Sequence, residues 1–186
     1  MRLFAALVPP EPVLISLANA VAPLRDLPYR WTAPEHWHVT LAFFGEVDDA
    51  TRLELERRLA RAAARHAPVT LALTGGGGFG SAKNARVLWT GVRGDFQPLR
   101  DLARSVTAAA RRAGIELTEN RYKPHLTLAR LRTPTDVRPA VEALTEYASP
   151  TWTATEVELV RSHLAQGAGG RARYETIASW PLAGKV

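Results

Sequence analysis

The pattern of hydrophobic and polar positions alternates along the chain between short segments typical of strands and longer stripes typical of helices. Residues 3–8 form a short apolar run that predicts a strand, and residues 37–44 predict a second strand. Between them, one helical stripe is formed by Leu14, Leu17, Ala18 and Val21. A second helix is predicted after Asp48 and Asp49, and its apolar stripe is formed by Leu55, Leu59, Ala62 and Ala63.

The same order of elements returns in the second half of the chain. Residues 86–92 predict a strand, and a helix is predicted from Asp95 to Gly114 because glycine commonly ends helices. Residues 125–131 predict another strand. The helix after it has its apolar positions at Val137, Val141 and Leu144.

The repeated order indicates an internal duplication. His125 lies 87 positions after His38, and the strands before them repeat at a similar interval. We therefore predict an α+β fold of two pseudo-symmetric lobes, each an antiparallel sheet with helices on the outside, flanking a central cleft. The two lobes, 1–84 and 85–186, would form a single domain over 1–186, and the C-terminal strand is a candidate for exchange between them.

Two strands carry the residues best suited to chemistry. His38 and Thr40 are two positions apart, as are His125 and Thr127, and alternate strand residues point to the same face. If the lobes face each other, two imidazoles and two hydroxyls converge on one cleft. A single His-x-Thr sequence is common, but two copies at matching places in a repeat indicate a shared function.

This set of residues suits the hydrolysis of a cyclic phosphodiester. The reaction needs a base for the incoming water and an acid for the departing ribose oxygen, and histidine serves in both roles near neutral pH. Threonine hydroxyls can donate hydrogen bonds to the phosphate oxygens as charge develops on them. The residues alone do not decide whether His38 or His125 is the acid.

The chain resembles the two-histidine phosphoesterase superfamily, in particular the RNA 2′,3′-cyclic phosphodiesterases, also called 2′-5′ RNA ligases. The resemblance rests on HVTLAFFGEV (38–47), RVLWTGV (86–92), RYKPHLTLARL (121–131) and the C-terminal VELVRSHL and RARYETIASWPL. It implies that His38 donates a proton, that His125 accepts one, and that Thr40 and Thr127 bind the phosphate. Lys123 and Arg121, before the second motif, are candidates for contacts with RNA phosphates or for a solvated loop.

The resemblance also suggests Arg130, Tyr174 and Ser162 as substrate-binding residues. Strand alternation places Arg130 on the face opposite His125 unless the strand bulges or ends there. Phe43 occupies the equivalent place in the first copy, so the two halves differ chemically.

Two glycine-rich segments follow predicted strands, residues 75–80 after 68–73 and residues 167–170 after 155–161. The first, GGGGFG, matches G-x-G-x-x-G, but a strand rather than a helix follows it. We therefore interpret it as a flexible turn at the rim of the cleft.

The composition limits which cofactors and partners we expect. The chain has no cysteine, and we expect neither a metal nor another cofactor, although His36 shares the predicted face of His38. Arginine supplies 21 of the 24 basic residues, and the formal net charge is +6. This suits RNA ends or small cyclic-phosphate nucleotides as partners, but genome composition would explain it equally well.

No apolar run approaches the roughly 18 residues that a membrane span requires, so we expect a cytoplasmic monomer without a membrane partner. Four functions remain open. The chain hydrolyses 2′,3′-cyclic phosphate ends to 2′-phosphates, joins RNA ends through 2′-5′ linkages by the reverse reaction, binds RNA without catalysis, or acts on small cyclic nucleotides or cyclic ADP-ribose phosphate. The paired histidines favour an enzyme, because a binding module does not need two titratable groups.

Overall fold

The computed structural model describes residues 1–118, 121–163 and 172–184, and the glycine-rich turn predicted at 167–170 lies outside them. The strands are β1 (Arg2–Leu7), β2 (Arg30–Trp31), β3 (Val39–Glu46), β4 (Val69–Phe79), β5 (Ala85–Gly94), β6 (His125–Thr135), β7 (Trp152–Ala154), β8 (Glu156–His163) and β9 (Arg173–Pro181). The helices are α1 (Glu11–Val21), α2 (Asp49–Ala63), α3 (Phe96–Arg112) and α4 (Arg138–Ala143), with short 3₁₀ turns η1 (Ala22–Leu24) and η2 (Pro34–His36).

The strands form one antiparallel sheet in the order β7-β4-β5-β6-β3-β1-β8-β9, and β2 pairs with β6. Long ladders hold each half of this sheet together. Between the halves, β3 and β6 share a single register pair in the described residues, Val39 with Leu126. The predicted α+β class with two antiparallel halves is confirmed, and the halves meet at the two motif strands.

The two halves of the sheet do not take their strands in chain order. β4 comes from the first half of the sequence but pairs with β5 and β7, which come from the second. Conversely, β8 pairs with β1, and β9 pairs with β8. A division of the chain at residue 84 therefore separates strands that are hydrogen-bonded neighbours.

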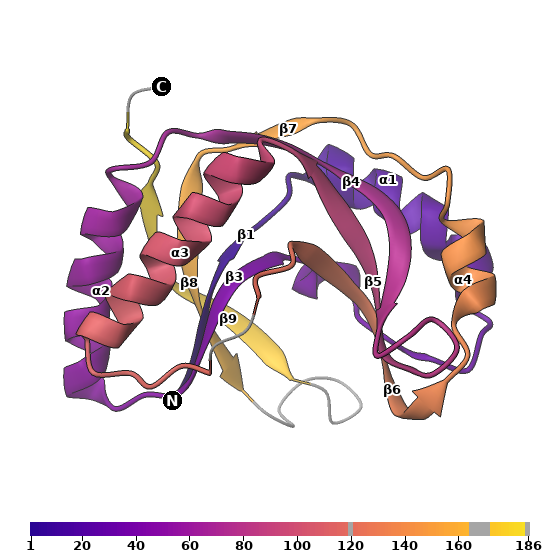
Figure 1. The fold of residues 1–186 in the computed structure, drawn as a ribbon, viewed down its shortest axis with the longest axis horizontal. Helices are drawn as coiled ribbons and strands as arrows, with labels where there is room; N and C mark the ends of the chain where they lie inside the picture. The colour runs from indigo at the N-terminus through magenta and orange to yellow at the C-terminus, as the bar shows by residue number, and fades with distance from the viewer. Residues whose placement is uncertain (119–120, 164–171, 185–186) are drawn as a thin grey trace.

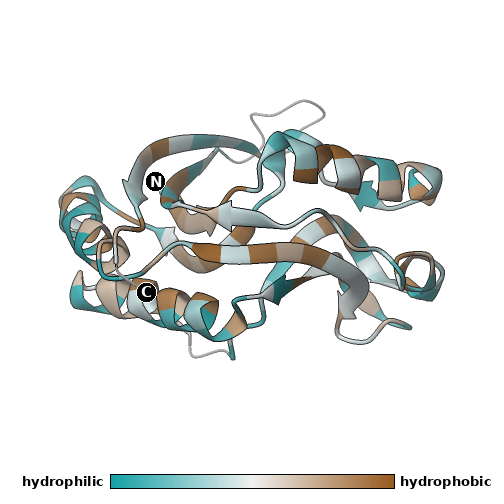
Figure 2. Cartoon of the chain, turned by 90° about the horizontal axis from the view of Figure 1, so that it is seen from above, coloured by the Kyte–Doolittle hydropathy of each residue, from teal (hydrophilic) through white to brown (hydrophobic). Residues whose placement is uncertain are grey.

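The helices lie on the outside of the sheet. Figure 1 shows α2 and α3 side by side on one flank, and α1 and α4 on the other. α3 buries an apolar stripe against the core and turns its charged positions outward, as its periodicity predicts. Figure 2 shows the same mixture of hydrophobic and hydrophilic residues along the helices. None of the helices in the described part of the chain is long and apolar enough to cross a membrane.

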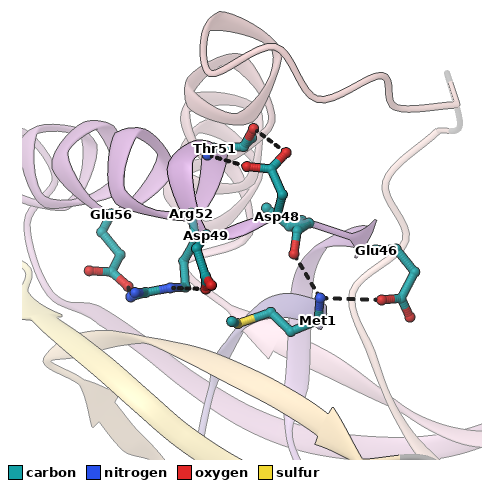
Figure 3. A network of polar contacts seen from close by, with 8 residues as sticks. Met1, Glu46, Asp48, Asp49, Thr51, Arg52 and Glu56 are labelled. Atoms are coloured by element: carbon teal, nitrogen blue, oxygen red, sulfur yellow. Dashed lines mark hydrogen bonds and ion pairs between the residues drawn. The ribbon is translucent and has the colours of Figure 1, made fainter.

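Polar contacts fix the start of α2 against the end of β3 (Figure 3). The Asp48 carboxylate accepts hydrogen bonds from the backbone N–H of Thr51 (2.8 Å) and from its hydroxyl (2.9 Å), as expected of an N-cap residue. The amino group of Met1 donates to the carbonyl of Val47 (2.7 Å) and lies 3.3 Å from the Glu46 carboxylate. β1, β3 and α2 are thereby joined at one corner.

The interpretation of residues 75–80 as a flexible turn is wrong for most of the segment, because β4 continues to Phe79. The reason is close packing against β5. A Cβ atom on Gly77 would lie 2.2 Å from ring atoms of Trp89, and one on Gly78 would lie 2.8 Å from the Cβ of Ala85. Glycine here lets the Trp89 ring lie directly on the backbone of β4.

Candidate active site

The two motif strands bring four polar side chains to one face of the sheet junction. Val39 faces Leu126, and both are buried. If this antiparallel register is extended by one residue on each side, Thr40 lies opposite His125, and His38 lies opposite Thr127. In this extended register, each histidine has the other motif's threonine as its cross-strand neighbour. The extended register agrees with the predicted convergence of the four residues, which stays a prediction.

A β-bulge interrupts each motif strand at the same place. On β3, Thr40 and Ala42 face the consecutive residues Ala6 and Ala5, so Leu41 is the extra residue. On β6, Thr127 and Ala129 face Trp89 and Leu88, so the extra residue is Leu128. A bulge reverses the alternation of side chains beyond it. Residues three positions after the threonines therefore return to the face of the histidines.

Those residues are Phe43 on β3 and Arg130 on β6. Leu128 and Ala129 are both buried, whereas Arg130 is exposed, as the broken alternation requires. Phe43 is 54% exposed although its side chain is large and apolar. Unbroken alternation would have placed Arg130 away from His125. The bulge brings it into the site.

Both imidazoles are fixed in the same way. The Nδ1 of His38 lies 2.7 Å from the carbonyl oxygen of His36, and the Nδ1 of His125 lies 2.7 Å from that of Lys123. A carbonyl can only accept, so Nδ1 carries the proton in each neutral ring and Nε2 has the free lone pair. In both motifs the acceptor is two residues before the histidine.

Aromatic rings enclose the histidines. The His38 ring stacks on Phe4 with centroids 4.6 Å apart and meets the edge of Tyr174 at 5.4 Å. The His125 ring meets the edge of Phe79 at 4.6 Å. Beside it, the Nζ of Lys123 lies 4.4 Å from the centroid of a Trp89 ring, a cation–π contact.

Burial and neighbouring charges lower the pKa of both histidines. Burial is the largest effect and lowers the pKa of His38 to about 4, while the hydrogen bond to the His36 carbonyl opposes the shift. The charges of Arg130 and of protonated His125 lower the pKa of His38 further. Burial also lowers the pKa of His125, which the hydrogen bond to Lys123 opposes and the charges of Arg130 and Lys123 reinforce. Arg130 thus acts electrostatically on both imidazoles.

Two cavities open beside the motifs, and Phe43 lines both. The larger, which we call the α3 groove, has a volume of about 1100 Å³ and includes Thr40, Lys123 and His125 in its lining. The smaller, which we call the Arg130 pocket, has a volume of about 580 Å³. Its lining includes Phe4, Arg30, Trp31, His36, Arg130, Ser162 and Tyr174.

The structure therefore brings the further candidates to two places. Arg130, Ser162 and Tyr174 line one pocket, and Ser162 faces Tyr174 across β8 and β9. Lys123 lies beside His125 instead. Sequence reasoning missed the rings of Phe4, Phe79 and Trp89. Phe4 and Trp89 lie on strands that were predicted from their apolar character, whereas Phe79 lies in the segment that was interpreted as a turn. Only the pairing register shows that these residues contact the motifs.

The described residues contain no group of three or more histidine, aspartate or glutamate side chains placed to hold a metal ion. His36, the third histidine near the first motif, lies in η2 rather than in β3, and its ring contacts Tyr174 at 4.8 Å.

A model of the 2′-5′ RNA ligase superfamily matches residues 13–166. The chain belongs to this superfamily. Its fold agrees with that assignment, because TT0787 of Thermus thermophilus superposes with a TM-score of 0.82 at 26% identity, over 100% of both chains. Escherichia coli LigT in complex with 3′-AMP superposes with a TM-score of 0.74 at 29% identity, over 97% of this chain and 96% of LigT.

Two relatives in the superfamily are RNA 2′,3′-cyclic phosphodiesterases. The one from Geobacillus stearothermophilus is 34% identical over 161 residues, which are 86% of this chain but 50% of the relative. The one from Escherichia coli (strain K12) is 32% identical over 155 residues, 82% of this chain and 80% of the relative. This chain thus spans about half the length of the Geobacillus protein, and most of the Escherichia coli protein.

Proposed function

We propose that this protein hydrolyses RNA 2′,3′-cyclic phosphate ends to 2′-phosphates, with His38 and His125 as an acid–base pair and without a metal ion. The observation that carries the proposal is the matched placement of the two imidazoles. Each is held through Nδ1 by a carbonyl two residues earlier, and each has Nε2 left for the substrate. Family membership and the relatives' activity support the same reaction.

The reaction consumes one water. Neutral His125 takes a proton from the water through Nε2, the water oxygen bonds to phosphorus, and the P–O3′ bond breaks. Protonated His38 gives its proton to the departing O3′, which leaves a 2′-phosphate and a 3′-hydroxyl. The direction of transfer follows the resemblance to the family, because the structure holds both rings alike.

Substrate binding offsets the low pKa of the histidines. At pH 7 both imidazoles are largely neutral in the free protein, since the pKa of each is lowered. A bound phosphodiester brings a negative charge next to them and raises both pKa values. Hydroxyl donors from Thr40 and Thr127 would stabilise the charge on the non-bridging oxygens, worth about 2–4 kcal/mol for each well-placed donor.

The remaining candidates bind substrate in this proposal. Arg130 would pair with the phosphate, because its charge already acts on both imidazoles. Tyr174 and Ser162 would contact the terminal nucleoside in the Arg130 pocket, whose volume of about 580 Å³ suits a small ligand. Lys123 would contact a phosphate beside His125. The structural neighbour LigT was solved in complex with 3′-AMP, which supports a nucleotide as the kind of ligand.

Incubation with an oligoribonucleotide that ends in a 2′,3′-cyclic phosphate, in EDTA, tests the proposal. We expect a product with a 2′-phosphate and no loss of rate. A rate that falls in EDTA and returns with a divalent ion would contradict the metal-free reaction. Formation of a 2′-5′ linkage with a second RNA end would favour ligation, and binding without any product would favour the noncatalytic RNA-binding module.

A further inference from the structure

The α3 groove is about twice as large as the Arg130 pocket, and its lining is cationic. Its cationic lining residues are Arg100, Arg104, Arg111, Arg121 and Lys123. Among its described lining residues there is no acidic side chain. The groove begins at Thr40 and His125, so its cations continue outward from the proposed catalytic centre.

One face of α3 forms the wall of the groove. The lining positions Gln97, Arg100, Arg104, Thr107 and Arg111 follow one another at intervals of three and four residues. The adjoining face of the helix is buried and holds it in place. From Arg100 to Arg111 the wall extends about 16 Å, at 1.5 Å per residue.

We propose that the RNA strand upstream of the cyclic phosphate lies in the α3 groove, with its phosphodiester groups against Arg100 and Arg104. This inference rests on the proposed function and adds where the rest of the substrate binds. Guanidinium groups suit phosphates, and a cationic groove of this length accommodates a few nucleotides of single strand. The Arg130 pocket has about half the volume and several aromatic residues, which suits one nucleoside better than a chain.

The partners of these two arginines do not prevent phosphate binding. Arg104 lies 2.6 Å from the carboxylate of Asp101, three positions earlier, and its side chain is 77% exposed. Exposed pairs of this kind contribute little to stability, so a phosphate can replace the carboxylate. The guanidinium of Arg100 lies 5.7 Å from the centroid of the Phe96 ring, on the same helix.

A charge-reversed double variant, Arg100→Glu with Arg104→Glu, tests the inference. We expect its kcat/KM for an oligoribonucleotide ending in a 2′,3′-cyclic phosphate to fall about tenfold or more. With a 2′,3′-cyclic mononucleotide, which has no upstream strand, kcat/KM should stay within about twofold. The salt dependence of oligonucleotide binding should also weaken, by about 0.7 in logarithmic slope for each lost phosphate contact.

Arg57→Glu is a control for one charge reversal outside the groove. Arg57 lies on α2, its side chain is 73% exposed, and it pairs with Glu54 three positions earlier, but it does not line the groove. It should leave oligonucleotide turnover unchanged. A logarithmic loss in Arg57→Glu of half that of the double variant or more would indicate net charge alone and would overturn the inference. An equal loss with the mononucleotide in the double variant would also overturn the inference. Unaltered oligonucleotide turnover in the double variant would overturn it as well, and would favour an acidic protein partner for the groove.

The inference can fail separately from the proposed function. If the unaltered protein hydrolyses neither substrate, the proposed function fails, and binding of an oligonucleotide ending in a 2′-phosphate still tests the groove. Fluorescence anisotropy should then show tighter binding to the unaltered protein and to Arg57→Glu than to the double variant. Equal affinity for all three would overturn the inference.

Discussion

The two motif strands share one backbone design and differ in what surrounds it. Both have a His-x-Thr sequence, both hold Nδ1 of the histidine on a carbonyl two residues earlier, and both bulge after the threonine. Beyond the bulge, one strand presents Phe43 and the other Arg130. The common features position reactive groups, whereas the differences decide which part of a substrate each strand contacts.

The two histidines also differ in how deeply they are buried and in which residues surround them. His38 is enclosed by Phe4 and Tyr174 and is the more deeply buried of the two, with a pKa lowered to about 4. His125 lies beside Lys123 and opens to the cationic α3 groove. A chain with this duplication can therefore keep a symmetric reaction centre while binding an asymmetric substrate.

The largest effects are expected at the histidines. His38→Ala and His125→Ala should each reduce turnover by about 10²–10⁴-fold, the usual share of one general acid or base. The double variant should be scarcely slower than either single variant, because the two groups act in one displacement. Steady-state rates with the cyclic-phosphate oligonucleotide measure this. Multiplying losses would instead indicate independent roles.

Removal of one hydroxyl should have a smaller effect. Thr40→Val and Thr127→Val keep the shape of the side chain and remove the donor, and each should lower kcat by about 10²-fold. The pH dependence of the rate should keep its shape, since threonine does not titrate in this range. A loss confined to one of the two would show that only one motif binds the phosphate oxygens.

Stability should depend on pH through His38. Its pKa is lowered to about 4 in the folded protein, so the unfolded chain takes up a proton first as the pH falls below the ordinary value of 6.5. Between pH 7 and pH 5 this should cost at most about 2 kcal/mol of the free energy of unfolding. Denaturant unfolding of the unaltered protein and of His38→Gln measures the difference. An equal pH dependence in both would contradict the low pKa.

The residues beyond the bulges should give the smallest change. Arg130→Gln should lower kcat/KM by about tenfold through the loss of one charged phosphate contact. It should also raise the pKa of both histidines, because the Arg130 charge lowers them. Phe43→Leu should not shift either pKa, and it serves as the matched control. NMR titration of the imidazole resonances in both variants tests this effect of the Arg130 charge. An unchanged pKa of the histidines in Arg130→Gln would contradict it.

The sequence predicts the two motif strands, their shared face and the order of the elements, because hydrophobic periodicity is local. It does not predict the position of Arg130, since the bulge at Leu128 depends on pairing with Leu88 and Trp89. The sequence also does not predict that β4 continues through Gly77. The Trp89 ring covers that glycine only after β4 and β5 pair.

The pH dependence of kcat/KM in the two histidine variants tests the acid–base account most directly. The unaltered protein should give a bell-shaped profile, because one histidine must be charged while the other is neutral, with its centre below pH 6.5 since both pKa values are lowered. If His38 is the acid and His125 the base, His38→Ala should keep only the limb that rises with pH, and His125→Ala only the limb that falls. Bell-shaped profiles that persist in both variants would show that other groups carry the proton transfers.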